Sequence, residues 1–205
     1  MLMSHQDDIE YQLDTLAIRT GHTRSFEGEH SEPIFLTSSF VYENAAEAAA
    51  KFSGAEPGNI YSRFTNPTVA MFEKRLAALE GAERAVATST GMAAIMAVAM
   101  AFLKSGDHVI CSRAVFGSTV SLFEKYIAKF GVTVDFVDLS DLNAWKNAIK
   151  PETKLLFVES PSNPLAEIAD IQALADIAHA NGALLAIDNS FCTPVLQQPI
   201  KFGAD

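Results

Sequence analysis

From residue 66 onward, short apolar segments alternate with amphipathic segments of about three helical turns. Apolar runs of this length, bounded by turn residues, are typical of buried strands, and the amphipathic spacing is typical of helices. The pattern predicts strands at 85–88, 108–111, 132–137, 155–158 and 183–187, and helices at 67–80, 92–103, 118–130, 142–149 and 171–181. Strands that alternate with helices form βαβ units with right-handed crossovers. We therefore predict an α/β fold with a mostly parallel sheet flanked by helices.

The beginning of the chain has a different pattern. A short amphipathic helix is expected between Ile9 and Gly21, followed by a loop rich in charge and glycine and by an extended stretch at 33–42. An Ala-rich helix capped by Asn44 comes next. These elements have too little apolar surface to form a core by themselves, so we interpret residues 1–60 as an N-terminal arm.

The last four residues, 202–205, have the pattern of a turn into a further strand. A chain that stopped there would leave an uncovered edge on a hydrophobic sheet, and such edges promote aggregation. We therefore expect this chain to be part of a longer polypeptide. Residues 61–205 are then an incomplete large domain, whose remainder lies beyond Asp205.

Composition argues against several classes of function. The net charge of −10 and the pI near 4.9 do not suit nucleic acid, which binds clustered Lys and Arg. The longest apolar stretch, 91–103, is too short to span a membrane, and the acidic N-terminus does not resemble a signal peptide. Cys111 and Cys192 lie far apart, and the histidines have no metal-ligand spacing. These features predict a cytoplasmic protein without a metal site.

The first candidate ligand site is the segment from Ser89 to Met92, at a strand-to-helix junction. Gly91 lets the backbone approach an anion closely, and the N–H groups at the start of the helix supply donors. The segment lacks the glycine spacing of dinucleotide and P-loop sites. An ordinary helix cap is an equal alternative.

Two further segments offer polar groups to a ligand. Tyr61 and Arg63 are two apart in an extended stretch, so both side chains can face one anion. The alternative is a surface arginine beside a core tyrosine. Asn163 lies in a turn fixed by Pro161 and Pro164, where its amide suits a phenolate or carboxylate oxygen. This segment also fits an ordinary loop.

Asp188 ends the apolar run 184–187. A carboxylate on a buried strand is costly unless a cation meets it. Ligands of open α/β sheets bind outside the carboxyl ends of the strands, where this carboxylate is expected. No Ser-His-Asp arrangement or GxSxG motif accompanies it, and Cys192 is better explained by packing. A ligand with a positive charge is therefore expected at Asp188.

Taken in order, YSRFTNPT, STGMAA, ESPSNP and DNSF resemble the pyridoxal-phosphate enzymes of Cys/Met metabolism, the cystathionine γ-synthase-like family of fold type I. The resemblance runs from about residue 15 to Asp205. It implies the fold of the type I PLP-dependent transferases and pyridoxal 5'-phosphate as the cofactor. EGEHSEPIFLTSSFVY and VFGST are similar to the sulfhydrylase branch of that family.

The resemblance implies that backbone and arm residues bind the cofactor phosphate. Gly91 and Met92 would offer their N–H groups to it. Tyr61 and Arg63 would reach the phosphate held by a neighbouring subunit. Arginine suits this role because its planar guanidinium binds a phosphate dianion with direction as well as charge. The implied assembly is a homotetramer of dimers that share their active sites.

The same resemblance assigns residues around the cofactor ring. Asp188 would pair with the pyridine nitrogen and keep it protonated, while Asn163 would lie near the phenolic oxygen and Ser190 near the ring. Phe116 would stack on the ring. Phe116 and Asp188 are thus the implied catalytic residues of this chain, since the family's Schiff-base lysine belongs shortly after Asp205. The resemblance also implies a small domain after the large one.

Many members of the family have a tyrosine where this chain has Phe116. Phenylalanine stacks but carries no acidic proton, which weakens a lyase and fits the sulfhydrylase branch. The implied reaction is a γ-replacement in methionine biosynthesis, in which sulfide and O-succinylhomoserine give homocysteine and succinate. The alternatives are a cystathionine γ-synthase or γ-lyase, a methionine γ-lyase, or a non-catalytic α/β module. The sequence leaves open whether the acyl group is succinyl or acetyl.

Overall fold

The computed structural model describes residues 11–205, so Ile9, where the first helix was expected to begin, lies outside the described residues. The chain divides into two compact units, one up to Ala87 and one from Thr88 to Asp205. The expected boundary between an arm and a large domain near residue 60 stays a prediction.

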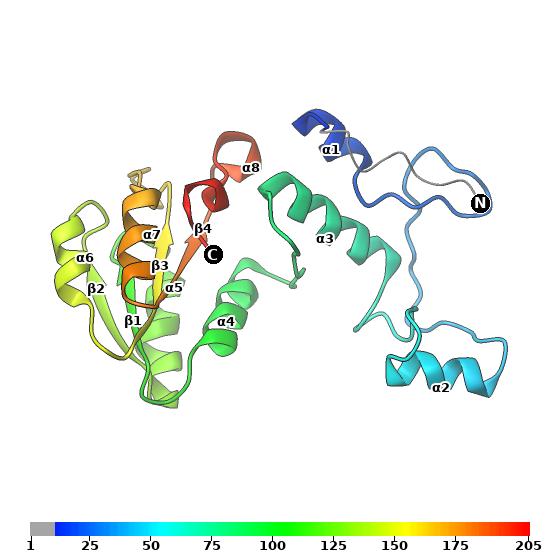
Figure 1. Ribbon diagram of the computed structural model, residues 1–205, viewed down its shortest axis with the longest axis horizontal. Coiled ribbons are helices and arrows are strands. Elements are labelled where there is room, and N and C mark those ends of the chain that lie inside the picture. The colour runs from blue at the N-terminus through cyan, green and yellow to red at the C-terminus, as the bar shows by residue number, and fades with distance from the viewer. Residues whose placement is uncertain (1–10) are drawn as a thin grey trace. The chain divides into compact units, whose positions relative to one another are not determined.

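The first unit consists of helices joined by extended loops. Its helices are α1 (Leu13–Arg19), α2 (Ala45–Ser53) and α3 (Pro67–Glu80) (Figure 1). Side-chain oxygens of Asn44 and Asn66 cap α2 and α3, and both helices end at glycines with positive φ, Gly54 and Gly81. These boundaries match the sequence pattern because caps act locally.

Polar contacts hold the loops of the first unit to α3. The Nε of Arg75 donates to the carbonyl oxygen of Thr20 at 3.0 Å, and the guanidinium pairs with Glu32. Neither α1 nor α2 has a buried residue, and Ala77 is the buried residue of α3. The first unit therefore has little core of its own.

The strand expected at 85–88 does not form. These residues pair with no strand in the described part of the chain. The N–H of Ala87 instead donates to the Glu73 carboxylate in α3 at 2.7 Å. An apolar run becomes a strand only where a neighbouring strand takes its backbone groups, and here a side chain takes one of them.

The second unit contains, within the described residues, a four-stranded sheet in the order β2-β1-β3-β4. The strands are β1 (His108–Ser112), β2 (Thr133–Val137), β3 (Thr153–Glu159) and β4 (Leu184–Asp188). All three pairings are parallel, which confirms the predicted α/β fold (Figure 1). β3 and β4 pair without a register shift up to their last residues, where Glu159 lies opposite Asp188.

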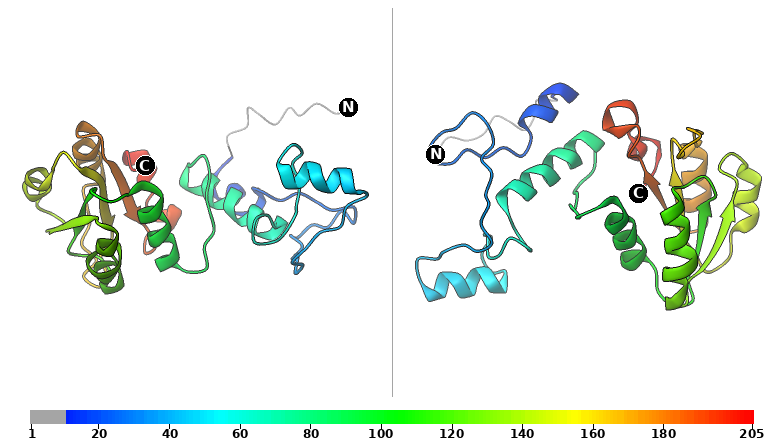
Figure 2. Two further views of the ribbon diagram at one scale, coloured as in Figure 1. Left: turned by 90° about the horizontal axis from the view of Figure 1, so that it is seen from below. Right: turned by 180° about the vertical axis from the view of Figure 1, so that it is seen from behind.

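Helices cover both faces of this sheet (Figure 2). They are α4 (Gly91–Phe102), α5 (Gly117–Ser121), α6 (Leu142–Ala148) and α7 (Ile171–Ala180). The short α8 (Thr193–Leu196), which has no buried residue, follows β4 in the chain. Short helical turns of other kinds complete the unit, a π turn at Leu122–Tyr126 and 3₁₀ turns at Ile127–Phe130 and Pro199–Phe202. The helix expected at 118–130 thus keeps a helical path but changes its hydrogen bonding twice. None of the described helices is both long and apolar enough to cross a bilayer.

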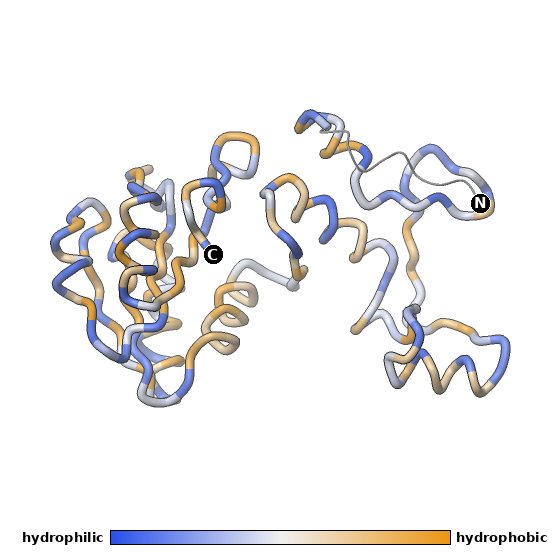
Figure 3. The backbone as a smooth tube through the Cα atoms, viewed as in Figure 1, coloured by the Kyte–Doolittle hydropathy of each residue, from blue (hydrophilic) through white to orange (hydrophobic). Residues whose placement is uncertain are grey.

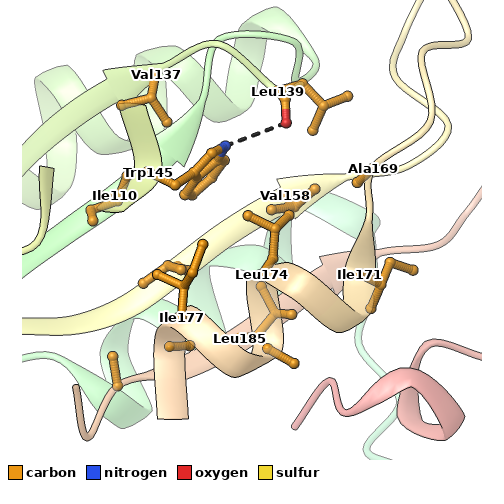
Figure 4. Close-up of a cluster of buried hydrophobic side chains, with 14 residues drawn as sticks. Ile110, Val137, Leu139, Trp145, Val158, Ala169, Ile171, Leu174, Ile177 and Leu185 are labelled. Carbon is orange, nitrogen blue, oxygen red and sulfur yellow. Dashed lines mark hydrogen bonds between the residues drawn. The ribbon is translucent and has the colours of Figure 1, made fainter. Parts of the chain in front are cut away.

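The core of the second unit lies on both sides of the sheet. Along β1, Ile110 faces a cluster that contains Trp145 of α6, whereas Val109 and Cys111 face a second cluster that contains Phe123. This alternation follows from the two-residue period of a strand, and burial on both faces explains the continuous apolar runs visible in Figure 3. The indole N–H of Trp145 donates to the Leu139 carbonyl at 3.3 Å, so its burial leaves no orphan donor (Figure 4).

A polar cluster lies at the opposite end of the strands from Asp188. His108, which is 1% exposed, begins β1, and its Nδ1 lies 2.8 Å from the Thr153 hydroxyl at the start of β3. Its Nε2 lies 3.3 Å from the Asp135 carboxylate and 3.3 Å from the Lys150 Nζ. Burial, and then the positive charge of Lys150, lower the pKa of His108 below its ordinary value of 6.5. The folded protein therefore favours the neutral imidazole.

We predict that acid destabilises the second unit through His108. Because the folded-state pKa is lower than the unfolded one, the unfolded chain binds the proton more readily. This contribution to stability is complete above about pH 6.5 and is lost as the pH falls below that value. Urea unfolding at several pH values should show the decline in the free energy of unfolding, and His108→Gln should flatten it. An equal decline in the variant would contradict the assignment to His108.

Candidate active site

The carboxyl edge of the sheet gathers most of the predicted site residues. Because the strands are parallel, the segments that follow β1, β3 and β4 leave the sheet at this edge. Phe116 follows β1, Asn163 follows β3, and Asp188 and Ser190 end or follow β4. The sequence prediction that these side chains belong to one edge agrees with this topology.

Asp188 is partly buried at the end of β4. Its Oδ1 accepts two hydrogen bonds from Ser190, one from the backbone N–H at 3.1 Å and one from the hydroxyl at 2.6 Å. Both bonds orient the carboxylate. They leave Oδ2 as the oxygen that can accept a further donor, which suits a protonated ring nitrogen.

Glu159, at the end of β3, is a site residue that sequence reasoning missed. It is 6% exposed, and its Oε2 accepts the backbone N–H of Phe116 at 2.6 Å. Burial, and then the negative charge of Asp188, raise the pKa of Glu159, while the bond from Phe116 acts in the opposite direction. The available signal was an acid at the end of an apolar run, the same signal that singled out Asp188.

The turn after β3 is held by two buried serines. Ser160 Oγ accepts the N–H of Ala169 at 3.0 Å, and Ser162 Oγ accepts the N–H of Glu167 at 3.0 Å. Cis peptide bonds precede both prolines of the segment. The partly buried Asn163 lies inside this fixed turn, so its amide is presented from a rigid position.

The side-chain amide of Gln197 joins the turn after β3 to the loop after β4. Gln197 Nε2 donates to the carbonyl oxygen of Ser160 and to Oδ1 of Asn189, both at 2.8 Å. Asn189 Nδ2 returns a bond to the Gln197 carbonyl at 2.9 Å. The segments that carry Asn163 and Ser190 are therefore fixed to each other as well as to their strands.

The start of α4 has the features of an anion site. Thr90 caps the helix by accepting the N–H of Ala93 at 3.0 Å, and the N–H groups of Gly91 and Met92 precede the first intrahelical bonds. A Cβ added to Gly91 would meet no atom within 4 Å, so open space lies beside its backbone. The Thr119 hydroxyl in α5 contacts the Met92 sulfur at 4.0 Å, which links this helix start to the segment after Phe116.

Tyr61 and Arg63 belong to the first unit. The Arg63 guanidinium carbon lies 4.9 Å from the centroid of the Tyr61 ring and 5.1 Å from that of Phe64. The two side chains share one side, but the segment is not extended as expected. Residues 62–64 form a turn in which the N–H groups of Phe64 and Thr65 donate to the Tyr61 carbonyl at 2.8 and 3.0 Å. Backbone contacts with residues 38 and 39 hold its beginning at Tyr61 and Ser62.

The chain matches a known protein family over most of its length. The matching residues are 14–205, and the family is described as Cys/Met metabolism PLP-dependent enzyme. The chain belongs to this family. Its members are PLP-dependent enzymes, and the predicted type I fold is confirmed.

Individual relatives include two curated enzymes and one solved structure. An O-succinylhomoserine sulfhydrylase of Pseudomonas aeruginosa is 66% identical over 94% of this chain and 48% of its own length. An L-methionine γ-lyase of Fusobacterium nucleatum is 42% identical over 96% and 50%. The metY protein of Campylobacter jejuni, solved with N'-pyridoxyl-lysine-5'-monophosphate, has a TM-score of 0.90 at 35% identity, over 96% and 48%. The chain thus spans about half the length of these relatives.

The residues at the sheet edge fit pyridoxal phosphate. Asp188 offers an oriented carboxylate to a ring nitrogen, and the half-exposed Phe116 side chain is accessible for stacking on a ring. The start of α4 offers backbone donors beside open space, which suits a phosphate. No group of three or more metal-ligating side chains occurs among residues 11–205.

We predict that Asn66 controls the shape of the segment that carries Tyr61 and Arg63. Asn66 Nδ2 donates to the Phe35 carbonyl and to the Ser62 hydroxyl, both at 3.0 Å, while Oδ1 caps α3. Asn66→Ala should lower the free energy of unfolding of the first unit by about 1–2 kcal/mol. It should also speed amide hydrogen exchange at residues 61–65.

Asn44→Ala is the matched control, because it removes a helix cap in the same unit without touching this segment. It should cost about 1 kcal/mol and leave exchange at residues 61–65 unchanged. Equal exchange in the two variants would show that Asn66 acts as a cap alone.

Proposed function

We propose that the polypeptide containing this chain is a PLP-dependent sulfhydrylase that converts O-succinylhomoserine and sulfide to homocysteine and succinate. The observation that carries the cofactor assignment is the Asp188 carboxylate, oriented by Ser190 on one oxygen at the carboxyl edge of the sheet. The choice of reaction is supported by the 66% identity to a sulfhydrylase and by phenylalanine at position 116.

Each predicted site residue has a physical role in this proposal. Asp188 stabilises the protonated ring nitrogen, and Phe116 packs on the ring face. Asn163 hydrogen-bonds the phenolic oxygen, and Ser190 holds the Asp188 carboxylate beside the ring. The bound cofactor supplies an electron sink for the negative charge that develops at the substrate α carbon.

Phosphate binding is proposed to involve both units of the chain. Gly91 and Met92 donate their N–H groups, as helix N-termini do to anions. Tyr61 and Arg63 bind the phosphate in a neighbouring subunit, which requires a homotetramer of dimers with shared sites. We also propose that the protein acts in the cytoplasm, in methionine biosynthesis, and that residues 1–60 are the arm of a larger domain that begins at residue 61.

A methionine γ-lyase is the second candidate, favoured by the 42% identity to the Fusobacterium enzyme. The two reactions differ after the γ substituent has departed, since replacement adds sulfide and elimination does not. A tyrosine hydroxyl at position 116 would add a proton-transferring group that phenylalanine lacks.

The cofactor proposal predicts a large effect of Asp188→Asn. In the full-length protein the variant should keep its fold but lose about 10²-fold in the rate of succinate release with sulfide, because a neutral amide cannot hold the ring nitrogen protonated. The visible absorption of bound cofactor should also shift. Glu124→Gln, on an exposed site of the second unit, is the control and should match the wild type. A wild-type protein without visible cofactor absorption would refute the proposal.

The choice between replacement and elimination rests on Phe116→Tyr. The added hydroxyl should raise the elimination rate about tenfold, measured as 2-oxobutanoate formed from O-succinylhomoserine without sulfide. Phe116→Leu, which removes the ring without adding a hydroxyl, should lower both reactions. An elimination rate that is high in the wild type and unchanged by the tyrosine would favour the lyase.

A further inference from the structure

Glu159 is a buried acid to which the proposed chemistry assigns no role. Its carboxylate bonds the backbone of a residue 43 positions away in the sequence, Phe116, at 2.6 Å. A hydrogen bond between an N–H and a carboxylate is both shorter and stronger than one between neutral groups. The acid lies opposite Asp188 in the register of two paired strands, where like charges repel. A buried acid beside another carboxylate needs a hydrogen bond that offsets its burial and this repulsion.

The segment that carries Phe116 is held at two separate points. Near the end of β1, the N–H of Arg113 donates to the Val137 carbonyl at 2.8 Å, and the N–H of Ala114 donates to the Ser112 hydroxyl at 3.0 Å. These contacts fix its beginning to β1 and β2. Phe116 itself is fixed through Glu159 to β3, the strand beside the one that carries Asp188.

Among residues 11–205, Glu159 is the side chain that the structure shows bonded to the Phe116 backbone, whose carbonyl accepts the N–H of Thr119 at 2.8 Å. Phe116 stands immediately before α5, where no side chain caps the helix. Its side chain is 48% exposed, so the ring is not locked by surrounding core residues. The position of the ring therefore depends on its backbone, which Glu159 holds at the N–H, Thr119 at the carbonyl and the buried neighbour Val115 by packing.

We propose that Glu159 is a positioning residue that sets the Phe116 ring relative to Asp188 by holding the Phe116 N–H. The proposal rests on the proposed function, in which Phe116 stacks on the cofactor ring and Asp188 binds its nitrogen. Asp188 then reaches the cofactor from the end of β4, while Phe116 is held through Glu159 to the end of β3, and the pairing of these two strands sets the spacing. The proposed role depends on two properties of Glu159, the length of its side chain and the oxygen that accepts the Phe116 N–H.

Two substitutions in the full-length protein distinguish the effect of the side-chain length of Glu159 from the effect of its charge. Glu159→Gln keeps the length and an acceptor oxygen but removes the charge, so it should stay within about twofold of the wild-type kcat. Glu159→Asp keeps the charge but shortens the side chain by one methylene, so kcat should fall about tenfold or more with little change in KM, as expected when a reacting geometry is lost. Glu167→Gln, an exposed acid in the neighbouring turn, is the matched control.

A second readout does not require the bound cofactor. In the apo protein, amide hydrogen exchange over residues 113–119 should be as slow in Glu159→Gln as in the wild type and about tenfold faster in Glu159→Asp. If exchange follows this pattern but the wild type binds no cofactor, the proposed function is wrong, whereas the role of Glu159 in holding the Phe116 backbone is supported. A normal Glu159→Asp, or a Glu159→Gln as impaired as Glu159→Asp, would overturn the positioning role.

A double-mutant cycle tests whether Glu159 acts through Phe116. In a Phe116→Ala background, Glu159→Asp should lower kcat by less than twofold, because the ring to be positioned is gone. An undiminished tenfold loss in that background would mean that Glu159 acts on the site by another route and would overturn the proposal.

Discussion

The parallel pairing of β3 with β4 is the constraint on which the candidate site depends. It continues without a shift to the last residues of both strands and leaves Glu159 and Asp188 side by side. Because both faces of the sheet are covered by closely packed apolar side chains, a slip of one residue would exchange the side chains that fill the two core clusters and disrupt their packing. The core thus fixes the register, and the register fixes the spacing of the two carboxyl groups at the site.

Much of the second unit could be predicted from the sequence, because strands buried on both faces are continuous apolar runs. The same rule failed at 85–88, where an apolar run has no neighbouring strand and Glu73 takes the N–H of Ala87. Helix ends in the first unit were predictable for a different reason. Asn44 and Asn66 bond to residues two or three positions away, so the signal is local.

The contact between Glu159 and Phe116 could not be found in the same way. It joins two segments 43 positions apart, and it uses a backbone N–H that every residue except proline possesses. Asp188 was recognised because its position after an apolar run combined with its neighbours into a family motif. A contact made through the backbone does not require a particular residue type, so it cannot be recognised in the sequence and is found only in the folded chain.

The side-chain amide of Gln197 joins two loops at the carboxyl edge of the sheet. Its bonds to Ser160 and Asn189 cross from the end of β3 to the end of β4. A loop transplanted from a relative into either position would bring its own geometry but lose this shared bridge. Attempts to change substrate preference by exchanging these loops should therefore move both segments, together with Gln197, as a single block.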